Sequence, residues 1–396
     1  MSNARPPLDG ITVVSIEQAI AAPLCTRQLS ELGARVIKIE RPDGGDFARY
    51  YDDRVSGLCS HFVWTNRGKE SLTLNLKHAS AQEVLNRLLH KADVFVQNLA
   101  PSAAARMGLG YESLKNQFDQ LIVCNISGYG DSGPYANKKA YDLLVQAEAG
   151  FLTVTGTEDL MIKSGVSIAD IAAGMQAHSA ILAALIQRSK TGQGSCIDIS
   201  MLEAMVEWMG FPLYYAYEGA EPPPRSGADH ASIYPYGLFV TGDDEVIMLG
   251  IQNEREWQAF CADVLGDSEL AQDQRFNTNA NRVLNRIALK EIIDRCFSQA
   301  SADQIIDQLD ASKIAFARVN DLEAVWNHPQ LKALERFIEV ETPNGIVKSL
   351  LPPGKNSNYE PDIKAVPGLG QHTDSILEAL NFSAVEISTL REEQAV

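Results

Sequence analysis

Residues 11–40 read ITVVSIEQAIAAPLCTRQLSELGARVIKIE and contain the pattern that specifies the architecture. The β-branched run Ile11–Ile16 predicts a strand, the spacing of apolar residues in Pro23–Leu32 predicts a helix, and Val36–Glu40 predicts a second strand. A strand, a helix and a strand in this order form a βαβ unit, whose two strands run parallel. The chain therefore begins with the building block of a parallel sheet.

The same alternation continues along the chain and predicts a large α/β domain. After the first unit we expect strands at Ser71–Leu76, Val94–Gln97, Leu121–Ser127 and Ser195–Ile199, with helices at Ala79–Leu89 and Met201–Trp208. Repeated βαβ units build a doubly wound, Rossmann-like parallel sheet with helices on both faces. We assign this large domain to residues 1–217.

A change of composition near residue 218 predicts a second, smaller domain. Glu218–His230 is rich in Pro, Gly and charge, as linkers are. Two strand-like runs in Ile233–Leu249 flank Thr241–Asp244, which is a hairpin signal, and helical patterns follow to Leu309. We expect a linker and an α+β domain over residues 218–330. Residues 331–396 should then return to the large domain.

Composition excludes several classes of function. The chain has 396 residues, is 45% hydrophobic and carries a formal net charge of −17, which disfavours nucleic acids and anionic membranes as partners. The sequence has no run of about 18 apolar residues and its first residues lack the apolar core of a signal peptide, so we expect a cytoplasmic protein. Six scattered cysteines, without metal-ligand spacing to histidine, indicate reduced thiols and no metal site.

Residues 164–176, SGVSIADIAAGMQ, place one carboxylate, Asp170, at the start of a long Ala-rich helix expected over residues 171–188. The simpler interpretation makes Asp170 the N-cap of that helix. The functional interpretation makes Asp170 a nucleophile, since burial, unpaired N–H groups and the helix dipole suit an ionised carboxylate in that role. Local sequence favours the cap, and the rest of the chain has to decide between the two.

A GxGxxG sequence at Gly128–Gly133 resembles a dinucleotide fingerprint but has the wrong context. It is followed by Pro134 and a polar stretch rather than by a helix, and it comes after several βα units. The turn after the first strand, where such a fingerprint belongs, has no glycine. We therefore expect no nicotinamide or flavin nucleotide cofactor.

Basic and polar residues occur shortly after the ends of successive predicted strands. Arg41, Lys77, Asn98 with Arg106, and Lys138 with Lys139 follow the second to fifth strands. Because the carboxyl ends of parallel strands share one edge of the sheet, these side chains predict a cationic rim for a phosphate-bearing ligand.

At this point the sequence resembles the family III CoA-transferases, the group that includes formyl-CoA and carnitine CoA-transferases. The matching segments are spread over most of the chain in a constant order. They are Pro7–Ile11, Ala22-Pro23, Leu32–Pro42, Gly45-Asp46, Asn66–Lys69, Leu74–Lys77, Ser127–Gly130, Gly133–Tyr135, Tyr141-Asp142, Gln146-Ala147, Gly150, Asp170, Gly174 and Gly192–Gly194.

The resemblance implies a mechanism and a set of site residues. The family's catalytic aspartate corresponds to Asp170, which would form a covalent aspartyl intermediate with acyl-CoA, without metal or ATP. The residues that would bind CoA, as the acyl-CoA substrate, are Ile20, Ala21, Arg41, Leu74, Asn75, Lys77, Asn98, Leu99, Ala100, Arg106, Lys139, Ala140, Tyr141 and Asp142. The resemblance also implies a homodimer of interlocked chains.

Departures from the family pattern narrow the substrate. The formyl-CoA enzymes carry a glycine run in the small domain and a glutamine in the first turn, where this chain has Ala231–Gly237 and Ile20. Both departures disfavour oxalate as the acceptor. The overall pattern most resembles family members that act on C4–C5 dicarboxylates, which implies CoA transfer from a donor such as succinyl-CoA to an acid such as itaconate or mesaconate. Arg49, Arg67 and Arg225 are candidates for binding the second carboxylate.

Two alternatives remain open at this level. The first is an isomerase like the α-methylacyl-CoA racemases, although those enzymes use a histidine beside Tyr141 and this chain has none there. The second is a protein that binds acyl-CoA without turnover.

Overall fold

The structure is a computed structural model that describes residues 5–396, and it divides the chain into two compact units. The large unit contains the chain up to Ala149, Ser164–Met209 and Leu331–Val396. The small unit contains Gly150–Lys163 and Gly210–Gln330. Each unit is described by itself below.

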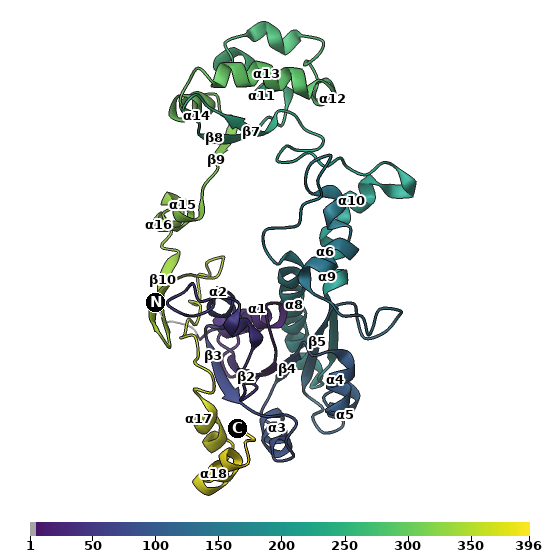
Figure 1. The fold of residues 1–396 in the computed structure, drawn as a ribbon, viewed down its shortest axis with the longest axis vertical. Coiled ribbons are helices and arrows are strands. Elements are labelled where there is room, and N and C mark those ends of the chain that lie inside the picture. Colours follow the sequence, from purple (N-terminus) through teal and green to yellow (C-terminus); the bar gives the residue numbers. More distant parts are fainter. Residues whose placement is uncertain (1–4) are drawn as a thin grey trace. The chain divides into compact units, whose positions relative to one another are not determined.

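A six-stranded parallel sheet forms the centre of the large unit, in the order β3-β2-β1-β4-β5-β6 (Figure 1). The strands are β1 (Thr12–Ile16), β2 (Arg35–Glu40), β3 (Lys69–Thr73), β4 (Val94–Gln97), β5 (Ile122–Ser127) and β6 (Cys196–Ser200). In register, Val14 of β1 pairs with Ile37 on one side and Phe95 on the other. The strand order reverses at β1, which is where open α/β sheets bind their ligands.

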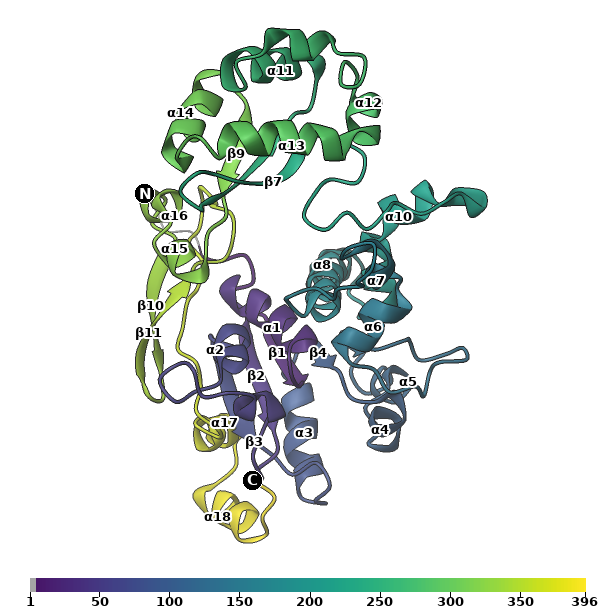
Figure 2. The same cartoon turned by 45° about the horizontal axis from the view of Figure 1, so that its top comes forward.

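Helices cover both faces of this sheet. On one face α3 (Ala81–Leu89) and the C-terminal helices α17 (Thr373–Ala379) and α18 (Ala384–Glu392) share a core with alternate strand residues such as Ile37 and Phe95. On the other face lie α1 (Ala21–Glu31) and α8 (Ile168–Thr191), which pack against each other (Figure 2). The fold class expected from the sequence is thus confirmed, including the return of the C-terminal segment to the large unit.

Helix α8 is the longest helix of the described chain and is apolar. Among the described residues it alone is long and apolar enough, by length and composition, to cross a membrane, with a mean hydropathy of 1.3. It packs on α1, α9 (Met201–Trp208), β5 and β6, which is the position of a core helix.

The small unit is α+β. Its antiparallel sheet joins β7 (Tyr236–Val240), β8 (Val246–Gly250) and β9 (Ala315–Arg318). Helices α11 (Glu254–Ala259), α13 (Arg286–Phe297) and α14 (Ala302–Ala311) cover one core built around Trp257, Phe260 and Phe297. The shorter helices of this unit are α7 (Phe151–Val154), α10 (Gly210–Tyr215), α12 (Asn279–Leu284) and α15 (Leu322–Trp326).

The remaining elements belong to the large unit or to its border. They are α2 (Ser60–Asn66), α4 (Pro101–Arg106), α5 (Tyr111–Leu114), α6 (Asp142–Glu148), α16 (Pro329–Ala333) and the antiparallel pair β10 (Phe337–Thr342) and β11 (Gly345–Leu350). The Gly128–Gly133 loop after β5 leads into turns rather than a helix, as its sequence context predicts.

Candidate active site

The turn between β1 and α1 carries the first part of the site. Ala19 adopts a left-handed conformation with φ of 64°, which is strained for a residue with a Cβ atom. Its N–H donates to Asp46 Oδ1 at 3.1 Å. Asn98 holds the preceding residue, because its Oδ1 accepts the Gln18 N–H at 3.0 Å and its Nδ2 donates to the Gln18 carbonyl at 2.8 Å. The surrounding strand ends therefore determine the shape of this turn.

Asp170 lies in the first turn of α8 and does not cap it. The helix begins at Ile168, with Ser167 at the N-cap position. The capping acceptor is Asp142, the first residue of α6, whose Oδ1 accepts the N–H groups of Ala169 at 2.8 Å and of Asp170 at 3.1 Å. The interpretation of Asp170 as an N-cap and the predicted start at residue 171 are therefore wrong. A carboxylate from a distant helix does the capping, and local sequence carries no sign of it.

The Asp170 carboxylate meets the start of α1. The backbone N–H of Ala21, the first residue of α1, is near enough to it to lower its pKa. The two helices approach closely because Gly174, one turn after Asp170, has no side chain. A Cβ atom there would lie 2.6 Å from the Ala21 carbonyl oxygen. The Asp170–Gly174 pair thus brings a carboxylate to the N-terminus of a neighbouring helix.

The electrostatic environment differs from the expectation that the helix N-terminus keeps Asp170 ionised. Burial and the nearby Asp142 carboxylate raise the pKa of Asp170 to about 7, against the lowering effect of the Ala21 N–H. Desolvation of a carboxylate and repulsion by a like charge both favour its protonated form. Asp170 therefore titrates near neutral pH, as perturbed groups at active sites commonly do.

Tyr51 is a neighbour of Asp170 that the sequence analysis missed. Burial, followed by the negative charges of Asp46 and Asp170, raises the pKa of Tyr51 to about 12. Its ring makes an edge contact with His61, with centroids 5.5 Å apart. Tyr51 belongs to no motif that the sequence analysis used, so only the folded chain reveals this neighbour.

The residues assigned to CoA by resemblance follow the carboxyl ends of five parallel strands. Ile20 and Ala21 follow β1, Arg41 follows β2, and Leu74, Asn75 and Lys77 follow β3. Asn98, Leu99, Ala100 and Arg106 follow β4, and Lys139, Ala140, Tyr141 and Asp142 follow β5. Parallel strands bring these ends to one edge of the sheet. Of the whole set, Ala21 and Asp142 directly contact Asp170.

Their side chains divide into two kinds. The side chains of Arg41, Lys77, Arg106 and Lys139 are exposed, although the Arg41 guanidinium already donates to the Gly45 carbonyl at 3.2 Å. The side chains of Leu74 and Ile20 are buried, so these two residues can offer a ligand little beyond their backbones. The side chains of Asn98 and Asp142 hold the β1 turn and α8 respectively. The sequence alone could not show which of these side chains are buried or already hydrogen-bonded within the protein.

The three arginines considered for a second substrate carboxylate already have partners. Arg49 pairs with Glu40 at 2.7 Å, and Arg67 donates to Glu31 at 2.8 Å. Arg225 donates to the Thr157 carbonyl at 2.7 Å. Each guanidinium therefore already binds a group of the protein and would have to give up that contact to bind a substrate carboxylate.

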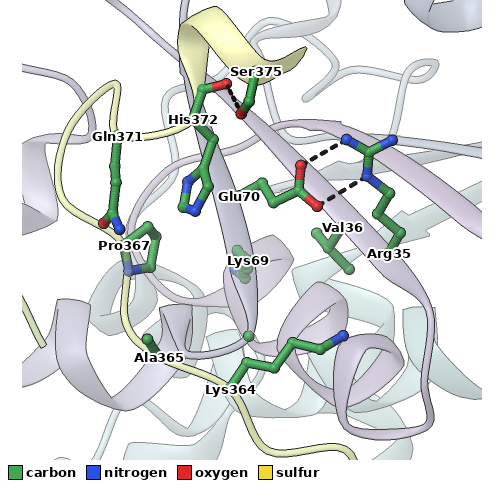
Figure 3. A pocket seen from close by; sticks show the side chains of 11 residues that line it. Arg35, Val36, Lys69, Glu70, Lys364, Ala365, Pro367, Gln371, His372 and Ser375 are labelled. Carbon is green, nitrogen blue, oxygen red and sulfur yellow. Dashed lines mark hydrogen bonds and ion pairs between the residues drawn. The ribbon is translucent and has the colours of Figure 1, made fainter. Parts of the chain in front are cut away.

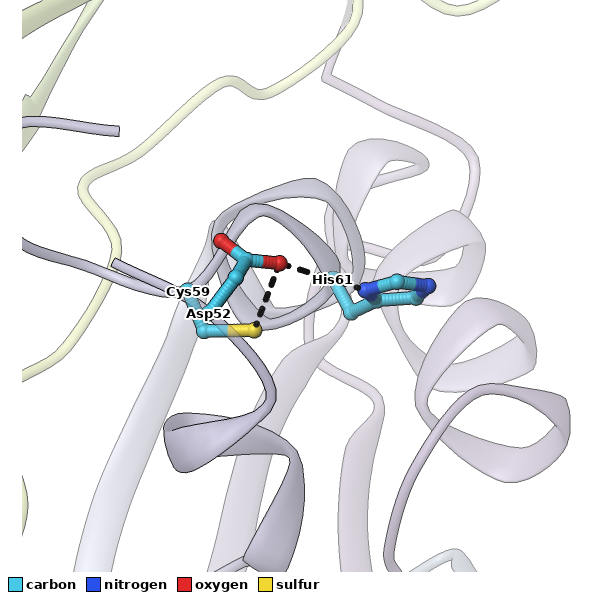
Figure 4. Close-up of side chains that lie close together, drawn as sticks. All are labelled: Asp52, Cys59 and His61. Atoms are coloured by element: carbon cyan, nitrogen blue, oxygen red, sulfur yellow. Dashed lines mark hydrogen bonds and ion pairs between the residues drawn. The ribbon is translucent and has the colours of Figure 1, made fainter. Parts of the chain in front are cut away.

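Two other features of the large unit are explained by the fold. Asp52, Cys59 and His61 place three ligand-type atoms within 4.8 Å of one another (Figure 4). Asp52 accepts hydrogen bonds from the Ser60 N–H at 2.9 Å and the Ser60 Oγ at 2.6 Å, at the residue where α2 begins. Its position is that of a helix-capping group.

A pocket of about 420 Å³ lies beside β3, between Arg35, Glu70 and the C-terminal segment around His372 (Figure 3). Arg35 and Lys69 are the first residues of β2 and β3, so this pocket is at the amino ends of the strands. Asp170 lies at the opposite, carboxyl edge, against the turn that follows β1. The pocket is therefore separate from the Asp170 site.

The candidate site thus consists of a partly buried carboxylate beside a helix N-terminus, on the carboxyl edge of a doubly wound sheet. Comparison with known proteins gives the class. Residues 8–373 match the model of CoA-transferase family III, and the chain belongs to this family.

Individual relatives agree. A protein named acyl-CoA transferase from Fusarium pseudograminearum is 33% identical and aligns with 99% of this chain and 89% of its own length. The human succinyl-CoA:glutarate CoA-transferase is 32% identical, over 98% of this chain and 90% of its own length. The crystal structure of a CAIB/BAIF family protein from Brucella suis has a TM-score of 0.86 and 32% identity, covering 95% of this chain and all of that one. The chain is a CoA-transferase and uses CoA thioesters as substrates.

Proposed function

We propose that this CoA-transferase moves CoA from succinyl-CoA to a C4–C5 dicarboxylate, such as glutarate, itaconate or mesaconate, with Asp170 as the nucleophile. The observation that carries the proposal is the Asp170 carboxylate, partly buried beside the Ala21 N–H at the carboxyl edge of the sheet. The dicarboxylate class is supported by the human relative, whose name specifies succinyl-CoA and glutarate.

The proposed reaction conserves the thioester bond energy in four exchanges. An Asp170 oxygen attacks the thioester carbonyl carbon of the donor, the C–S bond breaks, and a mixed anhydride and CoA thiolate form. The thiolate attacks the aspartyl carbonyl of the anhydride and releases the donor acid as its carboxylate. The acceptor carboxylate then attacks the aspartyl carbonyl of this thioester, the C–S bond breaks, and a second mixed anhydride and CoA thiolate form. The thiolate attacks the acceptor carbonyl of that anhydride, and the bond between this carbonyl and the Asp170 oxygen breaks. Asp170 is regenerated as a carboxylate, with no net proton consumed.

The chain's residues supply what these exchanges need. The Ala21 N–H lies where it can orient the carboxylate and stabilise negative charge that develops on oxygen. Partial burial limits access of water to the anhydride, which hydrolysis would waste. The exposed cations Arg41, Lys77 and Arg106 after neighbouring strands suit the phosphates of CoA.

Trapping the intermediate tests the nucleophile. Protein incubated with succinyl-CoA and then with hydroxylamine should carry a hydroxamate on the peptide that contains Asp170, detected by mass spectrometry. Asp170→Asn should give no adduct and lose transfer by more than about 10³-fold. Asp374→Asn, at an exposed aspartate of α17, is the matched control and should form the adduct normally. Absence of any adduct on the wild-type protein would refute the aspartyl mechanism, and retained CoA affinity would then indicate a binding protein.

The acceptor class needs its own experiment. The protein with succinyl-CoA is offered glutarate, itaconate, mesaconate, oxalate and butyrate separately, and new acyl-CoA products are detected by mass. We expect conversion of C5 dicarboxylates with kcat/KM at least about tenfold above that of butyrate, because a carboxylate-binding site discriminates against the apolar analogue. Preferential conversion of oxalate or of a monocarboxylate would reject the proposed substrate class.

We also propose that two copies of the chain associate. Five large apolar side chains of α6, α8 and α9 in the large unit are exposed, namely Leu143, Leu144, Met175, Ile186 and Trp208. Apolar residues gathered on neighbouring helices are typical of a buried interface. Light scattering coupled to size exclusion should give about twice the chain mass of 43.3 kDa. A mass of one chain at micromolar concentration would contradict this proposal.

A cytoplasmic location remains part of the proposal. All six cysteines are free and four of them are buried, as in proteins of reducing compartments. Fractionation of the cells that produce the protein would test it, and recovery from a secreted fraction would contradict it.

A further inference from the structure

Four charged side chains are buried together beside the β1 turn. We call Glu17, Lys38, Asp46 and Lys69 the buried charge cluster, and none of their side chains is exposed to solvent. Lys38 Nζ lies 2.6 Å from Asp46 Oδ2, and Lys69 Nζ lies 2.6 Å from Glu17 Oε1. Asn66 Oδ1 accepts hydrogen bonds from both lysines, at 2.9 and 3.0 Å. Two acids and two bases therefore neutralise one another inside the large unit.

Such a cluster is a poor source of stability. Desolvating charged groups costs several kcal/mol per ion, and apolar residues of similar size are often equally stabilising in their place. Burial lowers the pKa of Lys69 to about 8 even though Glu17 opposes the shift. Because burying these charges costs desolvation energy, the cluster is best explained by the part of the backbone whose conformation it fixes.

The cluster fixes the turn after β1, which leads to Ala21. The second oxygen of Asp46, Oδ1, accepts the Ala19 N–H at 3.1 Å and the Ala48 N–H at 2.9 Å. Lys69 Nζ also donates to the Pro23 carbonyl, in the first turn of α1, at 2.9 Å. The cluster thus contacts the backbone on both sides of Ala21, and one of these contacts holds the strained Ala19.

We propose that Asp46, fixed by Lys38, is a positioning residue for the transfer reaction, because it holds the β1 turn so that the Ala21 N–H points at the Asp170 carboxylate. The proposal rests on the proposed function of Asp170 as nucleophile. Asp46 itself acts through the turn. It orients a backbone donor, and a donor displaced by even 1 Å loses much of its effect on the reacting group.

The test separates geometry from stability. Asp46→Ala removes both the ion pair and the acceptor for the Ala19 N–H, whereas Asp46→Asn keeps an oxygen acceptor and removes the charge. The matched control is Glu31→Gln, which breaks another buried ion pair of the same unit, with Arg67 and Arg27, away from the β1 turn. For each variant kcat, KM for succinyl-CoA, the pH profile and the free energy of unfolding are measured.

We expect Asp46→Ala to lower kcat by about 30-fold or more with KM within about threefold, as for a group that acts in the transition state. The acidic limb of its pH profile should move to higher pH, because Asp170 loses a donor that favours its ionised form. Asp46→Asn should show the same changes in smaller measure. Glu31→Gln should lose comparable stability but keep kcat within about twofold and the acidic limb in place.

The proposal is overturned if Asp46→Ala behaves as Glu31→Gln does. Should Asp46→Ala fail to fold, Asp46→Asn and Lys38→Met decide, and an unchanged kcat and acidic limb in both overturns the proposal equally. A failure of the proposed function gives a different result, since the wild-type protein would then form no Asp170 adduct with succinyl-CoA.

Discussion

Asp170 combines two opposing requirements in one carboxylate. In the proposed mechanism partial burial would protect the acyl intermediate from water, but burial also favours the protonated form, which is not a nucleophile. The Ala21 N–H offsets part of this effect, while Asp142 caps α8 and adds a negative charge nearby. The pKa of about 7 is the balance of these contributions.

This balance predicts the pH dependence of the reaction. If Asp170 is the nucleophile, as proposed, only its ionised form reacts, so kcat/KM should fall below neutral pH with an apparent pKa near 7. Asp142→Asn keeps an oxygen that can cap α8 but removes the repelling charge, so the acidic limb should shift to lower pH. Steady-state rates between pH 5 and 9 measure both curves. An acidic limb that stays in place in Asp142→Asn would show that the charge of Asp142 has no influence on Asp170.

The same shift predicts an effect on stability. The folded-state pKa of Asp170 lies above the ordinary value of 3.8, so the folded protein binds this proton more tightly than the unfolded chain does. Folding is therefore penalised above about pH 7 and the penalty disappears as the pH falls toward 4. Asp170→Asn, which resembles the protonated form, should stabilise the protein by up to ~4 kcal/mol at pH 8 and by only ~1 kcal/mol at pH 4.5. Urea unfolding at the two pH values measures this, and equal effects at both would contradict it.

At the scale of elements, the contact between α1 and α8 forms the proposed site. Gly174→Ala introduces a methyl group that would lie 2.6 Å from the Ala21 carbonyl oxygen, so the helices must move apart by several tenths of an ångström. We expect kcat to fall by about 10- to 100-fold, since reacting groups tolerate little displacement.

The control for this variant is Gly110→Ala, where an added Cβ atom meets nothing within 4 Å. It should keep full activity. If Gly174→Ala also keeps full activity while remaining folded, the close approach of the helices does not determine the reaction.

Helices and strands with a regular spacing of apolar residues were predictable from sequence. The residues at which they begin and end were harder to predict. The strands β1, β2 and β4 were predicted to within about a residue because β-branched runs specify buried parallel strands. The start of α8 was placed three residues late, because its capping carboxylate, Asp142, comes from a different helix.

At the scale of the whole molecule, the chain returns to its first domain to complete it. Leu377 and Leu380 of the C-terminal segment are buried in the same core as Ile37 and Phe95 of the sheet. Residues more than 280 positions apart in sequence therefore share one core, and only α3 and its neighbours would cover this sheet face without the last helices.

This return predicts a stability effect far from the reaction. Leu377→Ala empties a fully buried position and should lower the free energy of unfolding by ~3 kcal/mol. Val385→Ala, at a position of α18 that is 76% exposed, should change it by less than ~0.5 kcal/mol. Below the unfolding temperature both variants should keep the wild-type kcat. A Leu377→Ala protein as stable as Val385→Ala would show that the C-terminal helices are not part of the core.

The amino-acid sequence alone determined the fold class, the alternation of strands and helices along the chain, and the family resemblance that singles out Asp170. These properties follow from periodic apolar patterns and short motifs, which are local in sequence. The tertiary structure decided which groups surround Asp170: the Ala21 N–H, the capping Asp142, the close approach at Gly174 and the buried charge cluster behind the turn. Those contacts join residues from different elements, and both the pKa of a carboxylate and the position of a backbone donor depend on distances in space that no local pattern encodes.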